Sequence, residues 1–146
     1  MSGLHELLGG ITIGVNWLAG LMGGVAWLTH RRVPGFWAAL RAGQLLILID
    51  AVIGAALLLD GEDLPRLHLI YGLVPIAVAF VAEQLRLTAA HTVLDQHDLE
   101  DAQAVATLPE AEQHALVALI VRRETGTMAA SAAVIALLAM RAQGWL

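Results

Sequence analysis

The chain has 146 residues, of which 58% are hydrophobic and only 14% are charged, and its mean hydropathy is +0.72. These values lie outside the range of soluble domains and predict a single integral membrane domain over residues 1–146. The net charge of -5, with no long run of basic residues, excludes the footprint of a nucleic-acid-binding protein. Because the chain has no cysteine, disulfides, thiolate metal sites, cysteine-ligated iron–sulfur clusters and thiol catalysis are excluded as well.

Four apolar stretches approach the roughly 20 residues that a helix needs to cross a bilayer. We expect membrane spans at about residues 4–29, 36–59, 67–88 and 125–142. The sequence therefore predicts an all-α integral membrane protein, a four-helix bundle whose first partner is the lipid bilayer. We expect this bundle in a cell membrane of the bacterial inner-membrane kind, on its own, as a homo-oligomer or in a larger membrane complex.

The short loops predict how the four spans are oriented. Basic residues mark the cytoplasmic side, and the first loop contains Arg31 and Arg32, whereas the second loop, residues 60–65, is acidic. We therefore expect both termini outside. Residues 89–124 form a largely polar, acidic segment with no apolar stretch long enough to cross. We expect this segment to be a cytoplasmic helical extension, folded as an antiparallel hairpin between the third and fourth membrane helices.

Two of the spans have a face of small and polar residues that begins with a histidine. Steps of four and three residues from each histidine give these two faces: His5, Gly9, Thr12, Asn16, Ala19, Gly23, Ala26 and His30, and His68, Gly72, Pro75, Ala79, Ala82 and Arg86. In lipid such faces pack inward. Because the first and third spans run in the same direction, we expect the faces to meet with His5 and His68 level near the outer surface.

Other small residues predict where helices approach each other closely. In the first span, Gly10 with Gly14 and Gly20 with Gly24 form small-xxx-small pairs. The fourth span has a small face of its own, formed by Gly126, Ala129, Ala133 and Ala136. We expect both features to serve helix packing.

The histidine pair is the main candidate for a ligand site. Two histidines that face each other across a bundle can hold a metal ion, or the iron of a haem, through neutral imidazole nitrogens. A porphyrin between two helices must pass close to the backbone about one turn from each ligand, and Gly9 and Gly72 lie at those positions. Arg66 at the outer mouth is suited to pair with propionates, and Tyr71 is a further candidate there. A purely structural interpretation stays open, because polar end residues and packing glycines are common near helix starts.

Through His5 with Gly9 and His68 with Gly72, across its four apolar spans, the chain resembles the four-helix membrane b-type cytochromes of the cytochrome b561 type. The resemblance implies bis-histidine binding of haem b and a function in electron transfer or haem handling. Two-haem members of that family have a second histidine pair lower on the same helices. This chain has apolar residues there, Leu18 or Ala19 and Val81 or Ala82, so the resemblance implies a single haem.

A second polar set lies deeper in the predicted spans, with Asn16 and Asp50 near mid-bilayer and Gln44 and Glu83 nearer the inner side. An ionisable residue at that depth costs at least ~2.5 kcal/mol, so Asp50 should face the bundle and find a partner. One alternative function is therefore a small oligomeric proton or cation transporter that uses Asp50 and Glu83. In the structural alternative, Asp50 hydrogen-bonds Asn16 and fixes the helix register.

A third possible function is that of a structural membrane subunit that docks a partner through its acidic cytoplasmic segment. The chain contains nothing that resembles a nucleophile triad, a phosphate-binding loop or a zinc-protease helix. No catalytic residue is therefore predicted, and the sequence leaves enzymatic activity open.

Overall fold

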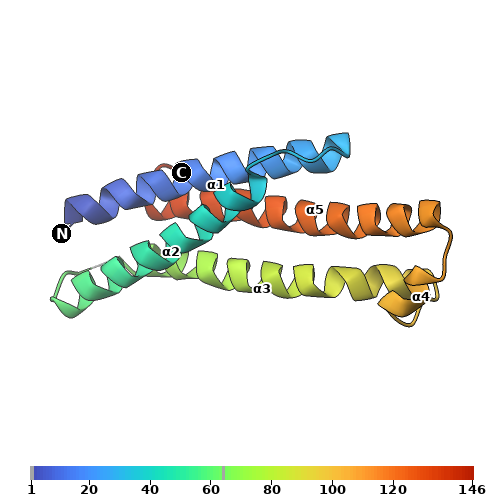
Figure 1. Ribbon diagram of the computed structural model, residues 1–146. Coiled ribbons are helices and arrows are strands. Elements are labelled where there is room, and N and C mark those ends of the chain that lie inside the picture. The colour runs from blue at the N-terminus through green and yellow to red at the C-terminus, as the bar shows by residue number, and fades with distance from the viewer. Residues whose placement is uncertain (1, 64) are drawn as a thin grey trace.

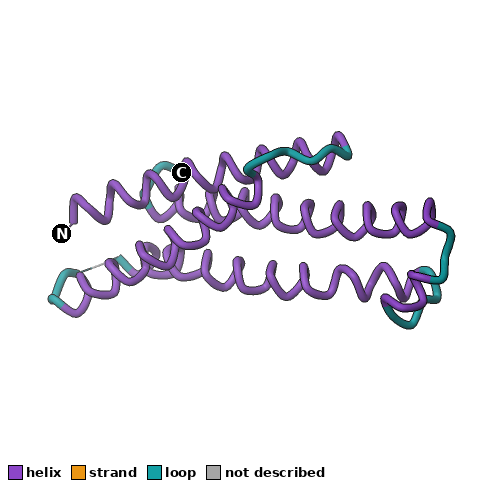
Figure 2. The backbone as a smooth tube through the Cα atoms, in the orientation of Figure 1, coloured by secondary structure: helices purple, strands orange, loops and turns teal. Residues whose placement is uncertain are grey.

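The computed structural model describes residues 2–63 and 65–146, and within these ranges it contains helices and short connections but no strand (Figure 2). The helices are α1 (Ser2–Thr29), α2 (Phe36–Leu59), α3 (Arg66–Gln96), α4 (Ala102–Ala106) and α5 (Glu110–Ala142). Four of them are long and apolar enough to cross a membrane. The predicted all-α class is thus confirmed, and the four long apolar helices fit the predicted membrane character.

The four long helices alternate in direction, with α1 and α3 running one way and α2 and α5 the other (Figure 1). Helix α5 packs along both α1 and α3, and α2 packs mainly on α1. The two histidine-bearing helices therefore lie across the bundle from each other with α5 between them. The expectation that their small faces pack directly together is wrong over most of their length, because the small residues of α5 fill the space.

The faces themselves do point inward. On α1, the buried residues include Gly9, Thr12, Asn16 and Ala19, and Asn16 and Ala19 are completely buried. Large apolar side chains on the other sides of the helices stay exposed, for example Phe80, which is 65% exposed. An apolar surface of this kind suits lipid, which covers apolar side chains but offers no partner to backbone polar groups.

Helix α1 approaches α5 most closely at Gly20 and Gly23. A methyl group on Gly23 would lie 2.7 Å from the Cβ atom of Ala129, and one on Gly20 would lie 3.3 Å from the backbone nitrogen of Ala133. At four other glycines of α1 a methyl group would meet nothing in the described part of the chain within 4 Å: Gly3, Gly10, Gly14 and Gly24. The predicted small-xxx-small pairs are therefore wrong apart from Gly20, because the other three lie off the buried stripe. The predicted small face of α5 is confirmed.

Helices α3 and α5 extend beyond the other two. With 33 residues at a rise of 1.5 Å, α5 is about 50 Å long, against ~30 Å of hydrocarbon. The projecting halves form an antiparallel hairpin that α4 closes, at the end of the bundle where α1 ends and α2 begins (Figure 1). The buried side chains of Val93 and Leu116 lie within this hairpin. The predicted helical extension between the third and fourth long helices is therefore present.

Candidate ligand site at the histidine pair

His5 and His68 meet inside the bundle near the starts of α1 and α3. Their Nε2 atoms lie 3.4 Å apart, and their rings cross at 74° with centroids 5.6 Å apart. Because the centroid separation exceeds the Nε2 separation by about the width of one imidazole ring, the two Nε2 atoms point almost straight at each other. The prediction that the two histidines lie level and face a common point is thus confirmed.

The ring of His68 is fixed by the end of α5. Its Nδ1 atom lies 2.9 Å from the backbone carbonyl oxygen of Ala142, the last residue of that helix. A carbonyl can only accept, so Nδ1 of His68 carries the hydrogen and Nε2 keeps a free lone pair. The carbonyls of a last helical turn have no partner within the helix, so this acceptor is free for the histidine.

The ring of His5 is held by α2. Its Nδ1 atom lies 2.8 Å from Oδ1 of Asp50, with side-chain exposures of 15% and 20%. The contact has the length of an ion pair without the alignment of an ideal hydrogen bond, and neither atom has another polar partner in the described part of the chain. The contact therefore places the carboxylate beside the ring by proximity, and not through an aligned hydrogen bond. The prediction that Asp50 faces the bundle and finds a partner is confirmed.

In the structural alternative drawn from the sequence, Asp50 hydrogen-bonds Asn16. The structure instead places Asp50 beside His5. The amide of Asn16 is completely buried, its Nδ2 atom donates to the carbonyl oxygen of Thr12 at 2.9 Å, and its Oδ1 atom has no partner among the described residues. The side chain lies against Gly43, where a methyl group would come within 2.8 Å of Oδ1. Since α1 and α2 are antiparallel and Asn16 is level with Gly43, Asp50 lies two turns nearer to His5.

A cavity of about 160 Å³ adjoins the histidine pair and is lined mostly by small and apolar side chains. Gly72 opens into it, because a methyl group there would meet nothing in the described residues within 4 Å. Gly9 lines the same cavity, but a methyl group there would overlap the side-chain amide nitrogen of Gln143. One half of the predicted slot for a flat ring is thus open, and Gln143 fills the other half.

Of the two residues predicted at the outer mouth, one lies at the cavity. Tyr71 lines it, and its ring centroid is 5.8 Å from the guanidinium carbon of Arg141. Arg66 is exposed at the start of α3 and does not line the cavity. Sequence reasoning missed Arg141, Ala142 and Gln143, because only the length and register of α5 bring its end to this place.

The other two predicted polar residues, Gln44 and Glu83, belong to a separate group nearer the start of α2 and further along α3. Glu83 accepts from Nε2 of Gln44 at 2.9 Å and from Nε of Arg86 at 2.9 Å, and it also pairs with Arg41. Arg41 in turn donates to Oε1 of Gln44 at 2.6 Å. Asp50 and Glu83 therefore belong to different groups, and each has its own partners.

Comparisons of the chain with protein-family models, with curated proteins and with solved structures found no match. The site is therefore interpreted from its own geometry. Within residues 2–63 and 65–146, no group of three or more His, Cys, Asp or Glu side chains is placed to hold a metal ion. The fold and the site together define a membrane-type four-helix bundle with a half-buried pair of opposed imidazoles.

Proposed function

We propose that the bundle binds one haem b between His5 and His68 and acts in electron transfer or haem handling, as the resemblance to b561-type cytochromes implied. The observation that carries the proposal is that Nδ1 of His68 has a backbone carbonyl as acceptor and Nδ1 of His5 has a carboxylate oxygen at 2.8 Å, while both Nε2 atoms face each other. Histidines that bind a metal almost always donate their other N–H to a carboxylate or a backbone carbonyl. Asp50 and Ala142 supply one of each.

The facing Nε2 atoms need either a shared hydrogen or a metal ion between them. When both Nδ1 atoms carry hydrogen and both rings are neutral, two lone pairs oppose each other across 3.4 Å, and this is unfavourable. A proton shared with the Asp50 side relieves the repulsion, and so does a metal. Two metal–nitrogen bonds in line span about 4 Å, since each is ~2.0–2.1 Å long. The two rings would therefore need to separate by about 0.6–0.8 Å to take a metal between them.

The in-line geometry supports haem more than a single bare metal ion, which is the second candidate. Two histidines would suffice to hold a haem, whose porphyrin supplies the other nitrogens, whereas a bare zinc ion takes about four ligands. Gly72 and the cavity beside it offer space for part of the ring. Bound haem would supply one-electron chemistry, and Arg141 joins Arg66 as a candidate partner for the propionates.

The same proposal includes an orientation in the membrane. Arg31 and Arg32 lie at one end of the bundle and the acidic connection between α2 and α3 at the other, which supports outer termini and an outer histidine pair. The projecting hairpin of α3, α4 and α5 would then be cytoplasmic, in a membrane of the bacterial inner-membrane kind.

An absorption spectrum of the purified protein tests the proposal. We expect a Soret band that is lost in His5→Ala and in His68→Ala. The matched controls are His91→Ala and His114→Ala, because both of these side chains are exposed and lie away from the cavity. Colourless protein that contains neither iron nor copper by elemental analysis, even after incubation with haem, would overturn the proposal.

The two other functions considered draw less support from the geometry. For a proton or cation path, Glu83 is held by two arginines and the chain from Asp50 through the two histidines ends at a backbone carbonyl. Flux into liposomes that disappears in Asp50→Asn would nevertheless favour transport. If the protein is a docking subunit, a partner protein should co-purify with it, and this co-purification should require the acidic segment of residues 95–112.

A further inference from the structure

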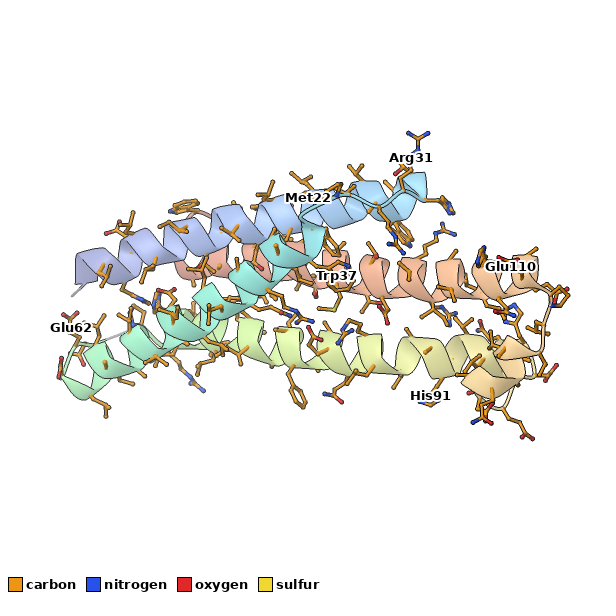
Figure 3. The ribbon with its side chains drawn as sticks, viewed as in Figure 1. Met22, Arg31, Trp37, Glu62, His91 and Glu110 are labelled. Carbon is orange, nitrogen blue, oxygen red and sulfur yellow. The ribbon has the colours of Figure 1, made fainter. Side chains whose placement is uncertain are left out.

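A second, larger hollow lies at the opposite end of α1 and α2. It has a volume of about 1060 Å³ and is bounded by the end of α1, the α1–α2 connection, the start of α2, Arg86 of α3 and the first half of α5. Figure 3 marks Arg31 and Trp37, which lie near the two ends of that connection. We call this hollow the arginine groove. The histidine pair and the arginine groove share no lining residue.

The arginine groove carries an excess of positive charge. Five of the eight basic residues of the chain line it, and the one carboxylate among its lining residues is Glu124: the five are Arg31, Arg32, Arg41, Arg86 and Arg122. Two of the five are paired with Glu83. In the described part of the chain, the other three form no ion pair, so their charge is available to an anion.

Two groups in the groove lack an acceptor. The Nε atom of Arg122 is buried and has no hydrogen-bond partner among the described residues, while its guanidinium carbon lies 5.7 Å from the ring centroid of Trp27. Helix α2 begins in the groove with Gly35 as its N-cap, and no side chain caps its first turn. A helix start of this kind favours an anion. Both groups therefore favour the same kind of ligand.

The lining is apolar as well as basic. Phe36, Val117 and Val121 line the groove beside the arginines, and its volume is at the upper end of the range of sites for organic ligands. A free inorganic anion would leave this apolar part unused, whereas an amphiphile would cover both parts. Basic pockets between membrane helices on the cytoplasmic side are typical sites for anionic lipid head groups.

We infer that the arginine groove binds an anionic phospholipid. Its phosphate lies against Arg31, Arg32 and Arg122 near the start of α2, and part of an acyl chain lies along Val117 and Val121 of α5. The inference does not depend on the haem, and its test uses no spectroscopic signal of the histidine pair.

Lipid titration of the detergent-purified full chain, followed by native mass spectrometry, tests the inference. We expect phosphatidylglycerol to bind at least about tenfold more tightly than phosphatidylcholine with the same acyl chains. Each of Arg31→Gln, Arg32→Gln and Arg122→Gln should weaken phosphatidylglycerol about fivefold. The matched control, Arg123→Gln, removes the arginine next to Arg122 that does not line the groove and should leave phosphatidylglycerol affinity unchanged. Glu124→Gln should tighten binding, a gain that misfolding does not produce.

Equal affinity for the two lipids, or full phosphatidylglycerol binding by the double variant of Arg31 and Arg32, would overturn the inference. A third arm distinguishes lipid from free phosphate. Inorganic phosphate should displace the lipid no better than chloride at equal ionic strength. If it displaces the lipid selectively, the groove is a site for a free anion and the lipid assignment is wrong.

Discussion

Two polar groups lie inside the same bundle and differ in how completely their atoms are paired. In the group around Glu83, two arginines and Gln44 satisfy both carboxylate oxygens. In the group of Asp50, His5 and His68, each Nδ1 atom lies beside an oxygen of a neighbouring helix, whereas the two Nε2 atoms face only each other. A fully paired polar network is sufficient as a structural link between helices. In the second group the two Nε2 atoms have only each other as partners within the described residues.

The largest difference between the two groups should appear on replacing Asp50. In Asp50→Asn the amide carries no charge to balance a cation on His5, and the loss of such an outer partner typically weakens metal binding 10–100-fold. We expect that loss in haem affinity, measured by titrating the haem-free protein and following its absorbance. Asp60→Asn, in the exposed connection after α2, is the control. Unchanged haem affinity would show that His5 does not need its carboxylate.

Glu83→Ala should have the opposite profile. It leaves two arginines and Gln44 without their shared acceptor, and we expect the free energy of unfolding to fall by about 1–2 kcal/mol. The cost stays below that of a fully buried pair because the Arg41 side chain is 49% exposed. Thermal unfolding in detergent, followed by circular dichroism, measures the change, with Glu62→Ala as the exposed control. A loss of haem affinity in parallel would mean that the two groups are coupled.

The smallest effect concerns the filled half of the slot. Gln143→Ala removes the side chain that lies against Gly9, so less of the protein must rearrange before a ring can enter. We expect haem affinity to rise by up to about threefold. Gly9→Ala should lower it, whereas Gly10→Ala places its methyl group where nothing in the described residues lies within 4 Å. Equal behaviour of the two glycine variants would argue against a ring passing at Gly9.

The sequence predicted the faces of the helices better than their neighbours. Helical spacing of small residues identified the inward side of α1 correctly, from Gly9 to Gly23, because burial in a bundle follows the helical repeat. The level of the two histidines followed from the parallel directions of α1 and α3. That α5 separates these helices could not be predicted, since several helices present small faces and composition does not decide which pair meets.

The contact partners of the two histidines could not be predicted from the sequence, for two different reasons. Asp50 was singled out, but its choice of His5 over Asn16 depends on the register of α1 against α2, which the contact of Asn16 with Gly43 determines. The acceptor for His68 belongs to the backbone, and a backbone carbonyl has no residue type by which a sequence could reveal it. Arg141 stayed unnoticed for a similar reason, because its position follows from the length of α5.

The carbonyl of Ala142 also limits what side-chain replacement can reveal. Any residue that keeps the last turn of α5 helical presents the same oxygen to His68, so a saturation scan would score position 142 as tolerant. Shortening α5 by one turn, or replacing that amide by an ester through chemical synthesis, would expose the dependence directly. Genetic tolerance at the carboxyl end of this chain is therefore no sign that the end is dispensable.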